Sequence, residues 1–218
     1  HLSAQLTPMP LHYGGERFAE GEAWFRRDVQ QEAQKRLKVV LQSFPESPAS
    51  DRSVLLLADA QFRAGAQNPD EYVSAWRTID SFALRRPNSP LLPFAYDIAA
   101  KRYLERERFS EAREYFAKSI GSTSENWASR SDSGYVVLLE DGLYWQGVCF
   151  MQESAVNTAF ADSAQIAFNR TASLYPHGRY ADDALFLLAR YAELTRHYDT
   201  ALARYDRIIT AYRDHAHA

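Results

Sequence analysis

Cysteine, lysine and long apolar runs are all scarce in this 218-residue sequence. Cys149 is the only cysteine, so the chain can form no internal disulfide, and its apolar neighbours Val148 and Phe150 predict a buried thiol rather than a reactive one. The longest apolar run, from Ala184 to Ala189, falls far short of the ~20 residues that a membrane-spanning helix requires. We therefore expect neither a disulfide framework nor a transmembrane segment in this chain.

Positive charge is also limited. The chain has 25 lysine and arginine residues against 28 acidic ones, a net charge of -3 and a pI near 6.1. Nucleic-acid binding uses a basic excess or stripe, so this balance excludes nucleic acid as the expected partner. Lys35, Lys38, Lys101 and Lys118 are the only lysines. The arginine bias has two explanations: a GC-rich genome, which we favour, or bidentate recognition of carboxylates.

Catalytic and metal-binding motifs are missing. The sequence has no glycine-rich phosphate loop, no Cys-x-x-Cys, no Gly-x-Ser-x-Gly and no His-Glu-x-x-His. Its adjacent carboxylates, such as Asp182 and Asp183, lie at solvated helix starts, where nothing apolar distinguishes the two groups as acid–base catalysis requires. His215 and His217 fit a polar chain end better than a metal site. We predict that the protein is not an enzyme and binds no cofactor or metal ion.

Residues 180–212 carry the clearest structural pattern and predict two amphipathic helices. The residues at helical spacing are Ala184, Leu185, Leu188, Ala189, Ala192, Ala201, Leu202, Tyr205, Ile208 and Ile209. The small Ala189 and Ala201 allow the two helix backbones to approach closely, and Tyr205 fills the space beside them. Small and large residues so arranged on paired helices, with a period near ~34 residues, are the signature of a tetratricopeptide repeat (TPR).

Related patterns recur along the whole chain. Alanines open five predicted second helices: Ala33, Ala75, Ala112, Ala164 and Ala201. We predict an all-α, right-handed TPR-like helical solenoid of about five helix–turn–helix repeats. The predicted organisation is an extended N-terminal arm over residues 1–12, repeats 1–3 over 13–120, a polar loop or hinge over 121–134, and repeats 4–5 over 135–218.

Three proline-containing junctions carry a family resemblance. They are SFPESP at 43–48, RRPNSP at 85–90 and LYPHGRYADDALFLLARYAE at 174–193. Proline pushes the preceding residue out of the helical region, so each junction ends a helix. The chain resembles tetratricopeptide proteins of the bacterial envelope, namely the BamD-like outer-membrane lipoproteins and the YbgF (CpoB)-type periplasmic proteins. That resemblance implies a location in the periplasm. Because the chain begins at His1 rather than with Met, we interpret it as a mature or trimmed form.

A binding surface is expected on the first helices of the repeats. In stacked helix pairs these helices line the concave side, which commonly receives a partner's peptide or helix. The packing pattern leaves a mixed aromatic and charged set free on them: Asp97, Lys101, Tyr144, Met151, Phe186, Arg190 and Glu193. Aromatic side chains supply contact area and arginine binds carboxylates, so this set predicts a polypeptide ligand. In the alternative interpretation, Tyr144 and Phe186 only pack against neighbouring repeats.

Together these features predict a non-catalytic scaffold that binds other proteins. We expect it to be a subunit of a bacterial envelope complex, in the periplasm and associated with the outer membrane. Two alternatives stay open at this point: a cytoplasmic TPR adaptor, and a cell-wall-associated enzyme subunit that holds a glycan in the groove.

Overall fold

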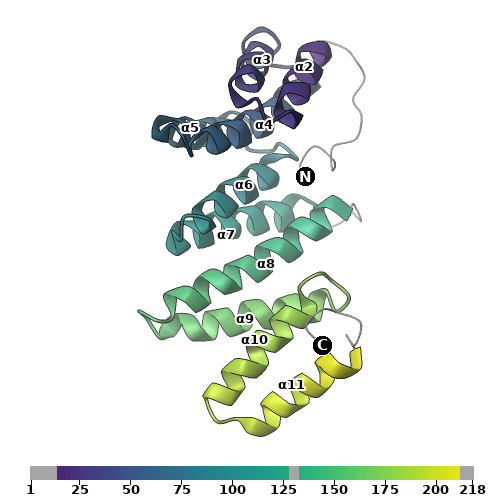
Figure 1. The fold of residues 1–218 in the computed structure, drawn as a ribbon. Helices are drawn as coiled ribbons and strands as arrows, with labels where there is room; N and C mark the ends of the chain where they lie inside the picture. The colour runs from purple at the N-terminus through teal and green to yellow at the C-terminus, as the bar shows by residue number, and fades with distance from the viewer. Residues whose placement is uncertain (1–13, 128–132, 212–218) are drawn as a thin grey trace. The chain divides into compact units, whose positions relative to one another are not determined.

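The computed structural model describes residues 14–127 and 133–211, and every regular element in these ranges is a helix (Figure 1). In chain order the helices are α2 (Gly15–Arg26), α3 (Gln30–Ser43), α4 (Pro48–Ala64), α5 (Pro69–Arg85), α6 (Leu92–Leu104), α7 (Phe109–Trp127), α8 (Ser133–Glu153), α9 (Ala159–Leu174), α10 (Ala181–Leu194) and α11 (Tyr198–Ala211). These ten helices make the five predicted pairs, and the all-α prediction is confirmed.

The chain divides into two compact units, residues 1–102 and 103–218, with the boundary inside α6. Within the first unit α3 packs against both α2 and α4, and α4 packs against α5. Within the second, each helix from α7 to α11 packs against the next one along the chain. Consecutive packing of this kind needs only short turns, because each pair is a hairpin of antiparallel helices (Figure 1).

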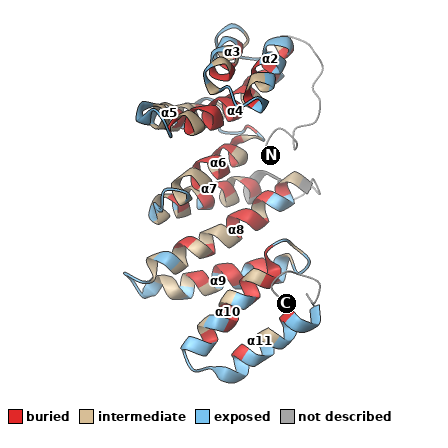
Figure 2. Cartoon of the chain, in the orientation of Figure 1, coloured by how far each residue is buried: buried red, intermediate tan, exposed pale blue. Residues whose placement is uncertain are grey.

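The first helix of a pair is buried more completely than the second. In α4 the consecutive residues Leu55, Leu56 and Leu57 are all buried, because the helix packs against neighbours on more than one side (Figure 2). In the second helix α5, by contrast, only Ala75, Ile79 and Phe82 are buried, one residue per turn. The first helices therefore form the core of each unit, and the second helices cover it.

Small residues set the close approaches between helices, as the sequence predicted. All five alanines expected to open the second helices are buried: Ala33, Ala75, Ala112, Ala164 and Ala201. Gly147 of α8 has a similar role, since a Cβ atom built there would lie 2.8 Å from the Phe168 ring of α9. Two residues of the predicted apolar face of α11 depart from the pattern. Leu202 and Ile209 are 60% and 55% exposed, on a side of α11 where no described helix packs.

The proline junctions form one recurring turn. Helices α3, α5 and α9 end before Phe44, Arg86 and Tyr175, each of which precedes a proline. The backbone angles of these three residues nearly coincide, with φ of -136°, -133° and -126° and ψ of 52°, 56° and 61°. Proline disfavours the helical region for the residue before it, so the motif ends each helix at the same point of the turn.

One part of the predicted organisation is wrong in its extent. We predicted a loop over residues 121–134, but α7 continues through Trp127 and α8 begins at Ser133. The polar residues misled the prediction because packing satisfies them: Thr123 is buried, and its hydroxyl donates a hydrogen bond of 2.8 Å to the Ser119 carbonyl. The arm predicted for residues 1–12 lies outside the described residues.

Candidate binding surfaces

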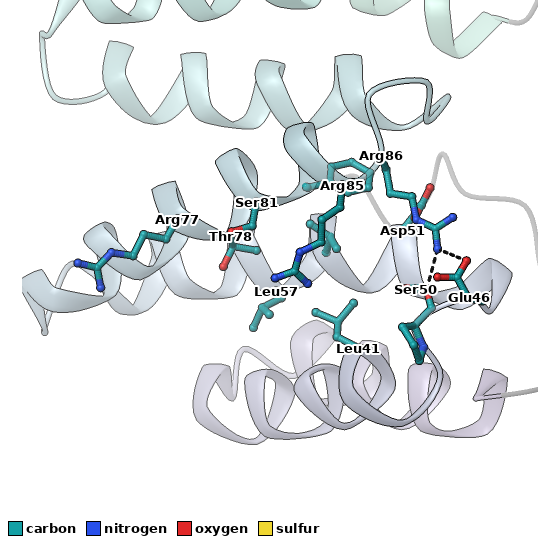
Figure 3. Close-up of a pocket in the computed structure, with 13 residues that line it drawn as sticks. Leu41, Glu46, Ser50, Asp51, Leu57, Arg77, Thr78, Ser81, Arg85 and Arg86 are labelled. Carbon is teal, nitrogen blue, oxygen red and sulfur yellow. Dashed lines mark hydrogen bonds and ion pairs between the residues drawn. The ribbon is translucent and has the colours of Figure 1, made fainter.

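A cavity of about 540 Å³ lies in the first unit, between the end of α3, the start of α4 and the length of α5 (Figure 3). Its apolar lining comes from Leu41, Pro45, Val54, Leu57 and Phe82. Its polar lining comes from Glu46, Ser50, Asp51, Arg77, Thr78, Ser81, Arg85 and Arg86. The cavity therefore combines an apolar base with a charged mouth.

The sequence of α5 explains why the two kinds of lining lie side by side. Ala75, Ile79 and Phe82 point into the core, and the neighbouring stripe of Arg77, Ser81 and Arg85 repeats every four residues. That spacing places the stripe along one edge of the helix, above the cavity. Figure 3 shows the Arg85 side chain directed toward Leu41 and Leu57, and the Arg77 side chain extending along α5 away from them.

One end of the cavity mouth is neutralised by ion pairs. The Arg86 Nη2 atom lies 2.7 Å from the Glu46 carboxylate and also donates a hydrogen bond of 2.9 Å to the Pro45 carbonyl. Asp51 lies 3.9 Å from the Arg86 guanidinium and accepts a hydrogen bond of 2.6 Å from the Ser89 hydroxyl. Here the single Arg86 charge is countered by two carboxylates.

The other two arginines of the mouth are not balanced in this way. Among the described residues, neither the Arg77 nor the Arg85 guanidinium has an ion pair or a hydrogen-bond partner. Both side chains are exposed. The mouth of the cavity therefore presents two positive charges that are available to an anionic ligand.

In the second unit, three of the sequence-predicted residues form one connected surface. The Phe186 ring of α10 is 43% exposed and meets the Tyr205 ring of α11 edge-on, with 6.2 Å between ring centroids. The Tyr205 hydroxyl donates a hydrogen bond of 3.2 Å to Glu193, and Arg190 lies 3.9 Å from the same carboxylate. Phe186, Arg190, Glu193 and Tyr205 are hereafter called the α10–α11 surface.

The two predicted residues of α8, Tyr144 and Met151, are half-buried and pack against their own unit. The Tyr144 ring stacks on Tyr180 with 4.3 Å between centroids, and burial, ahead of the nearby Asp183 charge, raises the pKa of Tyr144 to about 12. Met151 is half-buried against the core of the second unit. For Tyr144 the alternative interpretation, packing against the next repeat, therefore describes the structure.

The two predicted residues of α6 belong to the first unit. Asp97 is buried rather than free, which corrects the prediction, and its carboxylate lies 2.8 Å from the Lys101 ammonium one turn further on. The sequence could not show this, because the local period does not reveal which charged residues of a first helix are covered by neighbouring repeats. Lys101 stays partly exposed beside it.

The cysteine behaves as the sequence predicted. Cys149 of α8 is fully buried, and burial raises the pKa of its thiol to about 12. In the native state the thiol is therefore protonated and inaccessible, since the thiolate is the reactive form.

Two features sought for other functions are missing from the described parts of the chain. No group of three or more His, Cys, Asp or Glu side chains is placed to bind a metal ion there. None of the described helices has the length and apolar character needed to span a bilayer.

Comparison with known proteins supports the repeat fold. Residues 183–215, which include most of α10 and all of α11, match the tetratricopeptide repeat family. A crystal structure of nearly identical TPR-like repeats of Podosopora anserina, assigned to a kinesin light chain, has a TM-score of 0.62 at 13% identity, covering 96% of this chain and 100% of that one. A single-residue variant of those repeats has a TM-score of 0.60 at 13% identity, covering 93% and 97%. No curated protein sequence gives a significant match.

The class of protein follows from these observations: the chain has an all-α, TPR-like helical-repeat fold. More particularly, its last helix pair carries a tetratricopeptide repeat in its sequence as well as in its structure. At 13% identity the similar structures establish the fold alone.

Proposed function

We propose that this protein is a non-catalytic scaffold that binds another protein through the α10–α11 surface, as a subunit of a bacterial envelope complex. The observation that carries the proposal is the exposed Phe186 ring, held by Tyr205 and bordered by Arg190 and Glu193. Binding hot spots have this composition, an aromatic anchor inside a charged rim. TPR-like repeats supply such surfaces on helix pairs rather than catalytic clefts.

The envelope location is supported by the three proline junctions and their resemblance to BamD-like and YbgF-type proteins. In this chain the junctions are built as one repeated turn, which shows that the shared motif has the same structural role at each position. Subcellular fractionation tests the location directly. Recovery with the periplasm or the outer membrane agrees with the proposal, whereas recovery with the cytosol favours the cytoplasmic adaptor.

The binding role is tested by purifying the native complex from gently solubilised envelopes and identifying its members by mass spectrometry. We expect the wild-type protein to be recovered with a stoichiometric protein partner. The Phe186→Ala and Arg190→Glu variants should be recovered without that partner. The matched control is Val156→Ala, an exposed apolar residue in the turn after α8, which should retain the partner. Equal recovery of the partner with all three variants would exclude the α10–α11 surface as the binding site.

A further inference from the structure

The cavity of the first unit suits a ligand that is both apolar and anionic. Its volume of about 540 Å³ lies within the ~300–1,000 Å³ typical of ligand sites, enough for one large side chain and a short stretch of backbone. Leu41, Val54, Leu57 and Phe82 form the apolar wall against which such a side chain would pack. A ligand entering between α3 and α5 then passes the Arg77, Ser81 and Arg85 stripe.

The spacing of the two unpaired arginines sets the length of the ligand. Arg77 and Arg85 are eight residues apart on α5, which is about 12 Å along the helix axis. An extended peptide covers about 12 Å in roughly four residues. Two carboxylates four residues apart in an extended segment would therefore match the axial spacing of Arg77 and Arg85, with an apolar side chain between them directed into the cavity.

The ion-paired end of the mouth, which has two carboxylates for one guanidinium, gives the site a direction. Glu46 and Asp51 already pair with Arg86, so a third carboxylate placed there would be repelled. A phosphate backbone running along the mouth would meet the same two acidic residues, and the chain as a whole has a net charge of -3. These charges favour a short acidic segment over a polyanion.

From this arrangement we propose that the cavity between α3, α4 and α5 is a docking site for a short acidic protein segment, one apolar side chain filling the cavity and two flanking carboxylates binding Arg77 and Arg85. The site is formed by second helices and their neighbours in the first unit, whereas the α10–α11 surface belongs to the second unit. It extends the proposed scaffold function, because it adds a separate site with its own ligand chemistry.

The test uses the full chain and two fluorescent peptides that contain Glu-Ser-Phe-Ser-Glu or the uncharged counterpart Gln-Ser-Phe-Ser-Gln. Fluorescence anisotropy should show the acidic peptide binding at least about tenfold more tightly, because two charge-assisted contacts are lost in the counterpart. Binding of the acidic peptide should weaken as NaCl rises from about 0.05 to about 0.5 M. If the two peptides bind equally, or neither binds at about 1 mM, the proposal is overturned.

Three variants locate the site. Arg85→Gln should weaken binding of the acidic peptide about fivefold to tenfold, and the Arg77→Gln/Arg85→Gln double variant should abolish its preference over the counterpart. Ser81→Trp, which fills the cavity from the surface of α5 without removing a core residue, should block both peptides. The matched control is Arg207→Gln, which changes an exposed arginine on α11 of the second unit. This variant should bind the acidic peptide as tightly as the wild type does. Loss of binding with Arg207→Gln would point to a nonspecific charge effect and overturn the assignment.

Failure of this proposal is separable from failure of the scaffold function. The Phe186→Ala variant should still bind the acidic peptide. The Arg85→Gln variant should still bind the protein partner whose recovery depends on Phe186. Sedimentation with vesicles containing phosphatidylglycerol adds a further arm. Arginine-dependent vesicle binding without a preference between the two peptides would assign the cavity mouth to a membrane surface and overturn the protein-segment proposal.

Discussion

Each unit buries carboxylates on its first helices, and two of them, Asp59 and Glu140, contact the next repeat in different ways. Asp59 of α4 is 3% exposed and lies between two guanidiniums, 2.6 Å from Arg102 and 3.1 Å from Arg63. Glu140 of α8 is 6% exposed and accepts a hydrogen bond of 2.9 Å from the backbone N–H of Tyr180. One carboxylate is balanced by opposite charge, and the other holds a neutral backbone group at the start of α10.

Despite that difference, the two carboxylates make contacts over a similar sequence separation. Asp59 reaches 43 residues along the chain to Arg102, and Glu140 reaches 40 residues to Tyr180. Arg113 and Glu153, 2.7 Å apart, are also separated by 40 residues. Each contact ties one repeat to the next, which is where a stack of helix pairs gains its cooperativity. These contacts share a separation of about one repeat, while their chemistry and their places on the helices differ.

The largest expected loss of stability comes from removing the Asp59 carboxylate, which pairs with Arg63 and Arg102. Asp59→Ala would leave the Arg63 and Arg102 guanidiniums, both largely covered by the protein, without their shared carboxylate. Removing one partner of a buried ion pair typically costs 3–5 kcal/mol, and the partial exposure of the arginines places this loss at about 3 kcal/mol. Urea denaturation followed by circular dichroism measures it. A loss below about 1 kcal/mol would mean that water replaces the carboxylate.

A smaller loss of stability is expected from disturbing the hydrogen bond between the Glu140 carboxylate and the Tyr180 backbone N–H. Gly178→Ala would place a Cβ atom 2.2 Å from the Glu140 carboxylate, which must then move away from the Tyr180 N–H. Losing this buried hydrogen bond should lower the free energy of unfolding by about 1–2 kcal/mol. Faster maleimide labelling of the buried Cys149 would report the local opening of the second unit.

A double-mutant cycle separates that hydrogen bond from other effects of the added methyl group. In a Glu140→Ala background the clash is absent, so Gly178→Ala should cost at least about 1 kcal/mol less than it does in the wild type. If the two substitutions are instead additive, the glycine is required for the turn and not for the carboxylate.

The structure beyond the helix pairs was only partly predictable from the sequence. The inward residues of α10, such as Leu185, Leu188 and Ala192, were correctly predicted because one side of that helix packs on neighbours and the period of 3.6 residues reveals it. Asp97 was missed because a first helix is buried on more than one side, so a charged residue outside its apolar stripe can also be covered. Local periodicity contains no information on such contacts.

The same reasoning explains what was missed in the candidate sites. The sequence contains no sign of Arg77 and Arg85 as binding residues, because their place at the mouth of a cavity depends on how α3, α4 and α5 pack. Phe186 was found because an aromatic residue outside the apolar stripe of an amphipathic helix is visible in the sequence itself. The four-residue spacing of Arg77, Ser81 and Arg85 does place these side chains along one edge of α5. That spacing does not show that a cavity lies beside them.

The stability contributed by Glu140 should depend on pH. Burial, with a further contribution from Asp141, raises the pKa of Glu140 above its usual value of 4.5. The folded state therefore binds the proton more tightly than the unfolded state, so this group makes the protein less stable as the pH rises from 4.5 through the raised pKa. Glu140→Gln keeps an oxygen acceptor for Tyr180 and removes the titration. Relative to wild type, its stability should increase with pH across this window, by less than about 1 kcal/mol. A constant difference between the two proteins would assign the pH dependence to other groups.

The smallest change in stability should come from an ion pair that has a similar sequence separation but is exposed to solvent. Arg86 and Glu46 are also 40 residues apart and 2.7 Å from each other, but the Glu46 side chain is 84% exposed. Exposed pairs contribute little because water solvates both ions and the side chains lose freedom when they pair. Glu46→Gln should therefore change the free energy of unfolding by no more than about 0.5 kcal/mol, and about 0.5 M NaCl should remove most of that difference. A loss approaching that of Asp59→Ala would show that a separation of about one repeat, rather than burial, determines the strength of these contacts.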